Sequence, residues 1–187
     1  MSRASTGAAA STGSPTAESV QAGDGGASQL AAVRRATASF HNIDKAIEAG
    51  YASPVGGACD PSPAGTMGAH TPNPALLTAP LDAEKPAVLL YIPSGGGNYR
   101  LVAVEYFQAV LVRNTATGAV TLWFGAALPT TGYAILNPAP SLFGQRFQGP
   151  MAGHVPGMPW HYDLHVWLWD TNPNGMFAQW NPSISCN

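Results

Sequence analysis

The sequence predicts an α+β domain: a curled, mainly antiparallel β-sheet with an amphipathic helix at its N-terminal end. Three observations carry this prediction. Apolar residues recur every three or four positions near the start of the chain, and Val-, Leu- and aromatic-rich runs separated by Gly and Asn turns follow. These runs do not alternate with helical segments, so neighbouring runs should pair as hairpins. We expect about five or six strands, in a sheet that is either open or closed toward a barrel.

The composition favours one folded domain that binds a small molecule. The chain has 187 residues, of which 45% are hydrophobic and only 10% are charged, and its formal net charge is −2. The eight Lys and Arg residues are scattered, so they form neither a phosphate-binding stripe nor a basic membrane patch. We therefore predict no nucleic-acid partner; the small-molecule ligand or substrate that we expect instead rests on the candidate site described below. A run of about 18–20 apolar residues, which a membrane span requires, is absent from the sequence.

The first 28 residues differ from the rest of the chain. They are rich in Ala, Ser, Thr and Gly and contain no aromatic residue, so they can bury little apolar surface. We predict a disordered leader over residues 1–28 and a single globular domain over residues 29–187. The leader lacks the apolar stretch of a signal peptide.

The helical pattern covers residues 29–51. Its recurring apolar positions are Leu30, Val33, Ala36, Phe40, Ile43, Ile47 and Tyr51. Asn is a preferred residue at helix N-termini and Gly is a common residue just after a helix. The helix packed on the sheet, predicted over residues 29–50, therefore either runs through or divides at Asn42, and ends at Gly50.

Five apolar runs are predicted to be strands: residues 87–93, 99–108, 109–114, 119–125 and 161–169. The turn PSGGGN after the first run lacks the Gly-Lys-Ser/Thr of a phosphate-binding loop, so it should close a hairpin. Residues 52–80 and 126–160 are dense in Pro and Gly and are predicted to be long loops. Loops of this length are often functional.

The two cysteines predict one disulfide. Cys59 and Cys186 lie far apart, each in a Pro-, Ser- or Gly-rich segment typical of the surface. In the loop-entropy model, a bond that closes so long a loop contributes about 4–5 kcal/mol. Because structural disulfides persist in oxidising compartments, we expect a secreted, periplasmic or otherwise extracellular protein.

The stretch HYDLHVWLWD, residues 161–170, carries the strongest functional signal. In a strand, a spacing of two places His161, Asp163 and His165 on one face, which Trp167 and Trp169 should continue as an apolar wall. The opposite face is apolar and is predicted to be core: Tyr162, Leu164, Val166 and Leu168.

A carboxylate and a histidine elsewhere in the chain complete a candidate site. Glu105 is predicted to share a strand face with Leu101, Ala103 and Phe107. Because an unpaired buried carboxylate is costly, Glu105 should have a partner there. His70 lies in the first long loop, from which it can be aimed at the strands. Imidazole and carboxylate together suit a divalent transition metal such as Zn, Cu, Fe or Mn. The predicted metal ligands are His70, Glu105, His161 and His165, and the candidate catalytic carboxylates are Glu105 and Asp163.

Several interpretations of these residues stay open. The first is an extracytoplasmic metal-dependent enzyme, an oxidoreductase or a hydrolase or lyase, that acts on a small molecule. The second is a binding module that holds a metal or small ligand without turnover. A third is a metal-free site in which His165 is a base oriented by Asp163 or Glu105. A fourth is a set of hydrogen-bonded core residues without a ligand. His154, in a Gly- and Pro-rich segment, is a further candidate ligand.

Four segments resemble a largely uncharacterised family of small secreted bacterial and fungal proteins. They are ATASFHNIDKAIEAGY, MGAHTPNPALL, RLVAVEYF and HYDLHVWLWDTNPNGMFAQWNPSISC, and they contain an M-G-x-H-x-x-N-P motif and a Y-[DE]-L-H-V-W motif. The resemblance implies secretion and a site that includes His70, Glu105, Asp163 and His165. Thr71 departs from the family pattern, which has an aromatic residue at that position. The family supplies no reaction.

Overall fold

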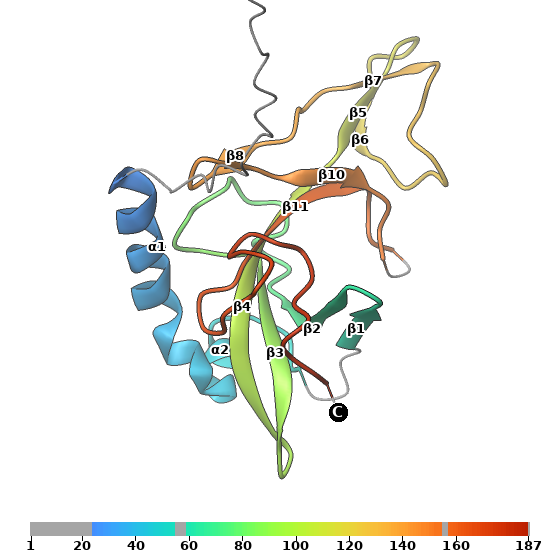
Figure 1. Ribbon diagram of the computed structural model, residues 1–187. Helices are drawn as coiled ribbons and strands as arrows, with labels where there is room; N and C mark the ends of the chain where they lie inside the picture. Colours follow the sequence, from blue (N-terminus) through green and yellow to red (C-terminus); the bar gives the residue numbers. More distant parts are fainter. Residues whose placement is uncertain (1–23, 55–58, 155–156, 187) are drawn as a thin grey trace, which may run out of the picture.

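The α+β prediction is confirmed by the computed structural model, which describes residues 24–54, 59–154 and 157–186 (Figure 1). The helical part consists of α1 (Asp24–Thr37), a 3-10 helix η1 (Ala38–His41) and α2 (Ile43–Glu48). Helix α1 begins at Asp24, before Gln29, where the amphipathic pattern starts, and the first buried residue of this helix is Leu30. Residues 1–23 of the predicted leader lie outside the described residues.

The predicted division of the helical segment at Asn42 is confirmed. The Asn42 side chain caps α2 by accepting a hydrogen bond of 2.9 Å from the Asp44 backbone N–H. This bond satisfies a donor that has no partner within the helix. Gly50 follows the helix with a φ of +94°, a left-handed conformation that glycine adopts without strain.

The main sheet contains six antiparallel strands in the order β1-β2-β3-β4-β11-β10, and it curls into a half-barrel (Figure 1). Its strands are β1 (Cys59–Ser62), β2 (Gly65–Pro72), β3 (Val88–Gly95), β4 (Asn98–Ala109), β10 (Gln148–Met151) and β11 (His161–Val166). Two small sheets accompany it: β5 (Leu111–Asn114), β6 (Val120–Leu122) and β7 (Tyr133–Ile135), and the pair β8 (Ser141–Leu142) and β9 (Gln145–Arg146).

The prediction of two long loops without strands was wrong. Residues 52–80 contain β1 and β2, and residues 126–160 contain β7 to β10. Dense Gly and Pro predict loops, but here glycine permits close strand pairing. A Cβ at Gly68 in β2 would lie 2.7 Å from the Tyr91 carbonyl oxygen, and one at Gly149 in β10 would lie 2.8 Å from that of His161. Only glycine allows these backbones to approach so closely.

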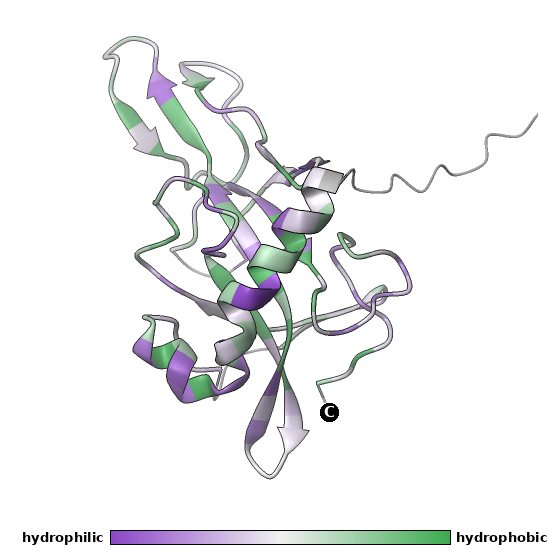
Figure 2. Ribbon diagram, turned by 90° about the vertical axis from the view of Figure 1, so that its left-hand side faces the viewer, coloured by the Kyte–Doolittle hydropathy of each residue, from purple (hydrophilic) through white to green (hydrophobic). Residues whose placement is uncertain are grey.

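The main sheet has two buried faces of different character. One, the helix face, packs Leu89, Val104, Tyr106 and Leu164 in a cluster that also contains Val33 of α1. Figure 2 shows α1 in front of the sheet, with hydrophobic residues along the strands behind it. The other, the site face, has a smaller cluster that includes Val88, Leu90, Ala103, Phe107 and Trp167. At roughly 25 cal/mol per Å² of buried apolar area, the larger helix-face cluster stabilises the fold most.

A β-bulge in β4 and the early end of β11 correct two details of the predicted faces. The pairing of β3 with β4 shifts between Leu90 and Tyr91, which leaves Val102 as an extra residue. An extra residue reverses the alternation, so Leu101 joins the helix-face cluster instead of lying beside Glu105. Strand β11 ends at Val166, and Trp169 therefore packs against the helix-face cluster, with its ring centroid 4.5 Å from that of His41.

The C-terminal segment is fixed to the first strands of the sheet. The predicted disulfide between Cys59 and Cys186 is present. Nearby, Thr66 of β2 and Asn181 exchange two backbone hydrogen bonds of 3.1 and 3.0 Å. Ile184 and Cys186 pack against the site-face cluster. The disulfide therefore holds the C-terminal segment against this face. In the part of the chain that the structure describes, no helix is long and apolar enough to cross a membrane.

Candidate metal centre

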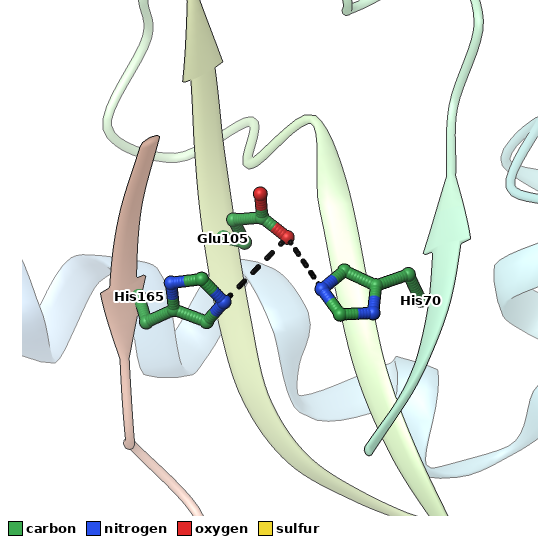
Figure 3. A group of neighbouring side chains, drawn as sticks. All are labelled: His70, Glu105 and His165. Carbon is green, nitrogen blue, oxygen red and sulfur yellow. Dashed lines mark ion pairs between the residues drawn. The ribbon is translucent and has the colours of Figure 1, made fainter. Parts of the chain in front are cut away.

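Three of the four predicted metal ligands meet on the site face (Figure 3). His70 comes from β2, Glu105 from β4 and His165 from β11. His165 is paired directly with Glu105 across β11 and β4, whereas His70 is paired with Leu90 of β3 and reaches past that strand. Because cross-strand partners project from the same face, three separate strands deliver their side chains to one point.

The distances within this group suit a bound cation. His70 Nε2 lies 3.3 Å from Glu105 Oε2, and His165 Nε2 lies 3.9 Å from the same oxygen. The three ligand atoms all lie within 4.8 Å of one another. Two ligands that each sit about 2.0–2.2 Å from a tetrahedral metal are separated by about 3–4 Å. Small side-chain movements are therefore enough to bring the three atoms to a common ion.

Several polar atoms beside this point lack hydrogen-bond partners among the described residues. They include both ring nitrogens of His165 and both carboxylate oxygens of Asp163, all inaccessible to solvent. A buried polar group without a partner costs about 1–3 kcal/mol, and native structures contain few of them. Four such atoms lie on the neighbouring side chains of Asp163 and His165. The interpretation as hydrogen-bonded core residues does not fit this arrangement.

Electrostatics place two of the ligands in the protonation states that a metal requires. Burial raises the pKa of Glu105, but the facing His165 and His70 outweigh this effect and lower the pKa to about 2. Burial lowers the pKa of His165 to about 4, against the opposing effect of Glu105. At neutral pH Glu105 is therefore ionised and His165 is neutral. Metal ligands must be deprotonated in this way.

Asp163 lies behind His165 and does not join the three-residue group. Its Oδ2 is 4.0 Å from Nδ1 of His165, whose Nε2 is directed toward Glu105. Histidines that bind metals commonly donate their other N–H to a carboxylate, which fixes the ring orientation. Burial, followed by repulsion from Glu105, raises the pKa of Asp163 to about 8. Asp163 is therefore mostly a neutral acid at neutral pH, and one of its oxygens lies 4.0 Å behind the His165 ring, where it is placed to accept the Nδ1–H and position that ring.

The structure does not bring His161, the fourth predicted ligand, into the group. Its ring stacks on Phe107 at a centroid distance of 4.7 Å, and its Nδ1 lies 3.1 Å from the Pro159 carbonyl oxygen. Burial lowers the pKa of His161, so its ring is neutral at pH 7. The exposed His154 lies beside it, with the two ring centroids 5.3 Å apart. These two histidines form a neighbouring pair.

A cavity of about 590 Å³ adjoins the three-residue group. His70 and Glu105 both line it, and so does His154. Most of the remaining lining is apolar: Pro72, Pro74, Leu77, Val88, Phe107, Ala109, Leu122, Phe124, Met158 and Pro159. Small-molecule sites combine such walls with a few polar groups in this way. A metal bound by His70 and Glu105 would therefore face this cavity.

A second cavity, of about 640 Å³, holds none of the predicted site residues. It lies between Gln29 of α1 and residues 79–83, and Tyr106 and Phe107 of β4 also line it. Its charged lining residues, Asp82 and Lys85, neutralise each other in an exposed ion pair of 3.2 Å. Among its described lining residues no group of polar side chains converges on one point, so the size of this cavity alone does not indicate a function.

The apolar walls of the smaller cavity could not be identified from the sequence. Leu122 and Phe124 come from the end of the predicted strand 119–125, and Met158 comes from a predicted loop. The only sequence signal for a cavity wall is Phe124, an aromatic residue near the end of the predicted strand, immediately before Gly125. In the structure, Phe124 is 58% exposed, unusual for so large an apolar side chain.

Comparisons of the chain with protein-family models, with curated proteins and with solved structures return no match. The case for the site therefore rests on its own geometry and chemistry.

Proposed function

We propose that the protein binds a divalent transition metal ion through His70, Glu105 and His165. The observation that carries the proposal is the convergence of three ligand atoms from three strands to within 4.8 Å. Glu105 and His165 are almost fully buried at 2% and 1% exposure, so a cation is the partner that best satisfies them together. Two imidazoles and one carboxylate occur in catalytic zinc sites and in Fe(II) oxygenases. Zn, Fe, Mn and Cu are all compatible with this donor set.

We further propose that the centre is catalytic, as a metal-dependent oxidoreductase or hydrolase or lyase that acts on a small molecule. Three protein ligands leave at least one coordination position for water or substrate, as in catalytic zinc sites. The cavity beside His70 and Glu105 supports an open position. A bound metal would polarise a substrate or activate water there. Glu105 binds the metal and neutralises part of its charge, and Asp163 positions His165.

The alternative function is a binding module that holds a metal without turnover. One observation favours it: His154 lines the same cavity and lies next to His161. A movement of these histidines toward the metal would fill the open position with protein groups and leave no place for a substrate. Spectroscopy of a Co²⁺-loaded sample separates the alternatives, because added small anions perturb the cobalt bands only when a coordination position is exchangeable.

We also infer that the protein acts outside the cytoplasm and belongs with the small secreted proteins that share its motifs. The Cys59–Cys186 disulfide supports an oxidising compartment. The M-G-x-H motif contributes His70, and the C-terminal motif contributes Asp163 and His165. Mass spectrometry of a non-reduced digest from exported protein should show the two cysteine peptides linked. Free, alkylatable thiols in that material would argue against secretion.

Elemental analysis tests metal binding directly. Protein purified without a chelator or a His-tag should contain about one equivalent of a transition metal, or should take one up on titration. His165→Ala and His70→Ala should lose this metal while the far-ultraviolet circular dichroism stays nearly unchanged. The proposal fails if no metal binds to the folded chain. If it fails, a metal-free pair with His165 as the base is the remaining catalytic interpretation.

A further inference from the structure

We propose that the cavity beside the metal centre binds an apolar monocarboxylate, a molecule with one carboxylate head and a hydrocarbon body. This inference rests on the proposed metal site and names the ligand class of that site. Two independent features carry it: the charges at one part of the cavity and the apolar surface over the rest.

The charges favour a head group with a single negative charge. Among the described lining residues, Glu105 is the only Asp, Glu, Lys or Arg side chain. Asp163 lies behind His165 and does not line the cavity. A divalent cation held by Glu105 therefore presents a charge of about +1 to the cavity, because the Glu105 carboxylate cancels one of its two charges. A carboxylate head neutralises this charge and supplies oxygen to the open coordination position. An ammonium head of the same size is repelled by the metal and has no carboxylate to pair with.

The walls favour a hydrocarbon body. Leu77, Phe107 and Met158 line the cavity together with Leu122 and Phe124, and they offer no hydrogen bonds to a polar ligand. The volume of about 590 Å³ lies within the usual range of roughly 300–1,000 Å³ for small-molecule sites. Each methylene group that such walls remove from water strengthens binding about threefold to fourfold.

Phe124 indicates where the body of the ligand lies. Its side chain lines the cavity and is also 58% exposed, so it stands at the opening. Phe124 lies two residues after Leu122, which is the last residue of β6 and also lines the cavity. A ligand whose head reaches the metal would extend its tail past Phe124 and cover this exposed ring. Val120, at the other end of β6, is 52% exposed and does not line the cavity.

The experiment uses the full chain and proceeds in two stages. Zinc affinity is measured first, by competition with a chromogenic chelator. Calorimetry then measures binding of butyrate, hexanoate and octanoate to the zinc-loaded protein, with octylamine as the head-group control and metal-free protein as the metal control. We expect affinity to rise about threefold to fourfold per methylene. Octylamine should bind at least tenfold more weakly than octanoate, and metal-free protein should lose at least tenfold in octanoate affinity.

Two variants test the placement of the tail. Phe124→Ala should weaken octanoate binding about fivefold, and should affect butyrate less because the shorter tail does not reach the opening. Val120→Ala is the matched control, an exposed apolar residue of the same strand region, and should leave octanoate affinity unchanged. Zinc affinity measured in parallel shows that both variants retain the folded metal centre.

The outcomes separate this inference from the proposed function. Failure of zinc binding in the first stage overturns both. Zinc binding with no dependence on chain length, or with equal affinity for octylamine and octanoate, overturns the ligand class and leaves the metal site standing. Equal effects of Phe124→Ala and Val120→Ala overturn the placement of the tail at the cavity opening.

Discussion

The two faces of the main sheet differ in how far their buried polar side chains are paired by hydrogen bonds. On the helix face, tyrosine hydroxyls donate to backbone carbonyls: Tyr51 to Pro86 at 2.7 Å, Tyr91 to Phe40 at 2.6 Å and Tyr106 to Ala83 at 2.5 Å. On the site face, the side chains of Asp163 and His165 have no hydrogen-bond partner among the described residues. On the helix face one such atom, Nε1 of Trp169, is also without a partner among the described residues. Because unpaired buried groups are costly, the larger group of them on the site face supports the ligand that we propose there.

The contrast extends to the charge states of the two faces. Burial raises the pKa of Tyr51 to about 12 and raises the pKa of Tyr106 further, so these hydroxyls remain neutral donors at every physiological pH. On the site face the pKa of Glu105 falls to about 2 while that of Asp163 rises to about 8. Neighbouring carboxyl groups with such different pKa values are typical of functional sites. The helix face stabilises the fold, and the site face holds the groups whose perturbed pKa values support the function that we propose.

The largest expected effect is the loss of metal binding when a site-face ligand is removed. His165→Ala should lower zinc affinity at least a hundredfold, because it removes one of three protein ligands. His41→Ala is the matched control: His41 is exposed and packs on Trp169, away from the group. Its zinc affinity should equal that of the unaltered chain. Chelator competition measures both, and similar losses in the two variants would contradict the assignment.

Metal should also stabilise the folded chain. A ligand at a hundred times its dissociation constant stabilises the native state by about 2.7 kcal/mol. For a domain of this size, we expect a rise in melting temperature of about 5–10 °C on adding zinc. Calorimetry with zinc and with a chelator measures the shift. A melting temperature that is the same in both conditions, at a zinc concentration that saturates the protein, would mean that the metal binds the unfolded chain equally well.

Asp163 should make the stability of the metal-free protein depend on pH. Its pKa is raised from 3.8 to about 8 in the folded chain, so between these values the folded state holds a proton that the unfolded state has released. Stability therefore falls as pH rises from about 4 to about 8. Asp163→Asn should remove this dependence and should stabilise the metal-free chain by about 1–3 kcal/mol at pH 8.

Urea denaturation of both metal-free chains between pH 5 and pH 9 checks this prediction. The stability difference between Asp163→Asn and the unaltered chain should grow with pH and level off above about pH 8. A difference that is constant across the range would show that Asp163 ionises normally. The same substitution should weaken zinc binding about tenfold to a hundredfold, since it alters the group that positions His165.

The smallest effect is expected on the helix face. Tyr106→Phe removes a hydroxyl that donates to the Ala83 carbonyl, so the free energy of unfolding should fall by about 1 kcal/mol. Zinc affinity should not change, because the hydroxyl lies on the opposite side of β4 from Glu105. A loss of zinc binding in this variant, measured by the same chelator assay, would show that the two faces are not independent.

The period of a strand explains how much of the site could be predicted. Alternation alone placed His161, Asp163 and His165 on one face of β11, and it placed the apolar residues Tyr162 and Leu164 on the other. These predictions need only the sequence of one strand. The class of the fold was predictable for a similar reason, since hairpin turns and apolar runs are local features.

The residues that meet across strands could not be predicted, because pairing register depends on the whole sheet. His165 meets Glu105 and His161 does not, a difference set by the register of β11 against β4. The bulge at Val102 moved Leu101 to the helix face. His70 lies in β2 and not in the predicted loop, because the glycines around it make this strand resemble a loop in the sequence. Local patterns thus identified the candidate ligands, and tertiary pairing selected three of them.

Anomalous diffraction from crystals of the zinc-loaded chain, recorded at the zinc absorption edge, tests the central claim most directly. The account predicts one strong peak on the site face, about 2.0–2.2 Å from Nε2 of His70, an Oε atom of Glu105 and Nε2 of His165. The peak should lie at the cavity lined by Phe124 and Met158. A zinc peak away from these three side chains, or no peak in crystals soaked with saturating zinc, would contradict the assignment of this group as a metal centre.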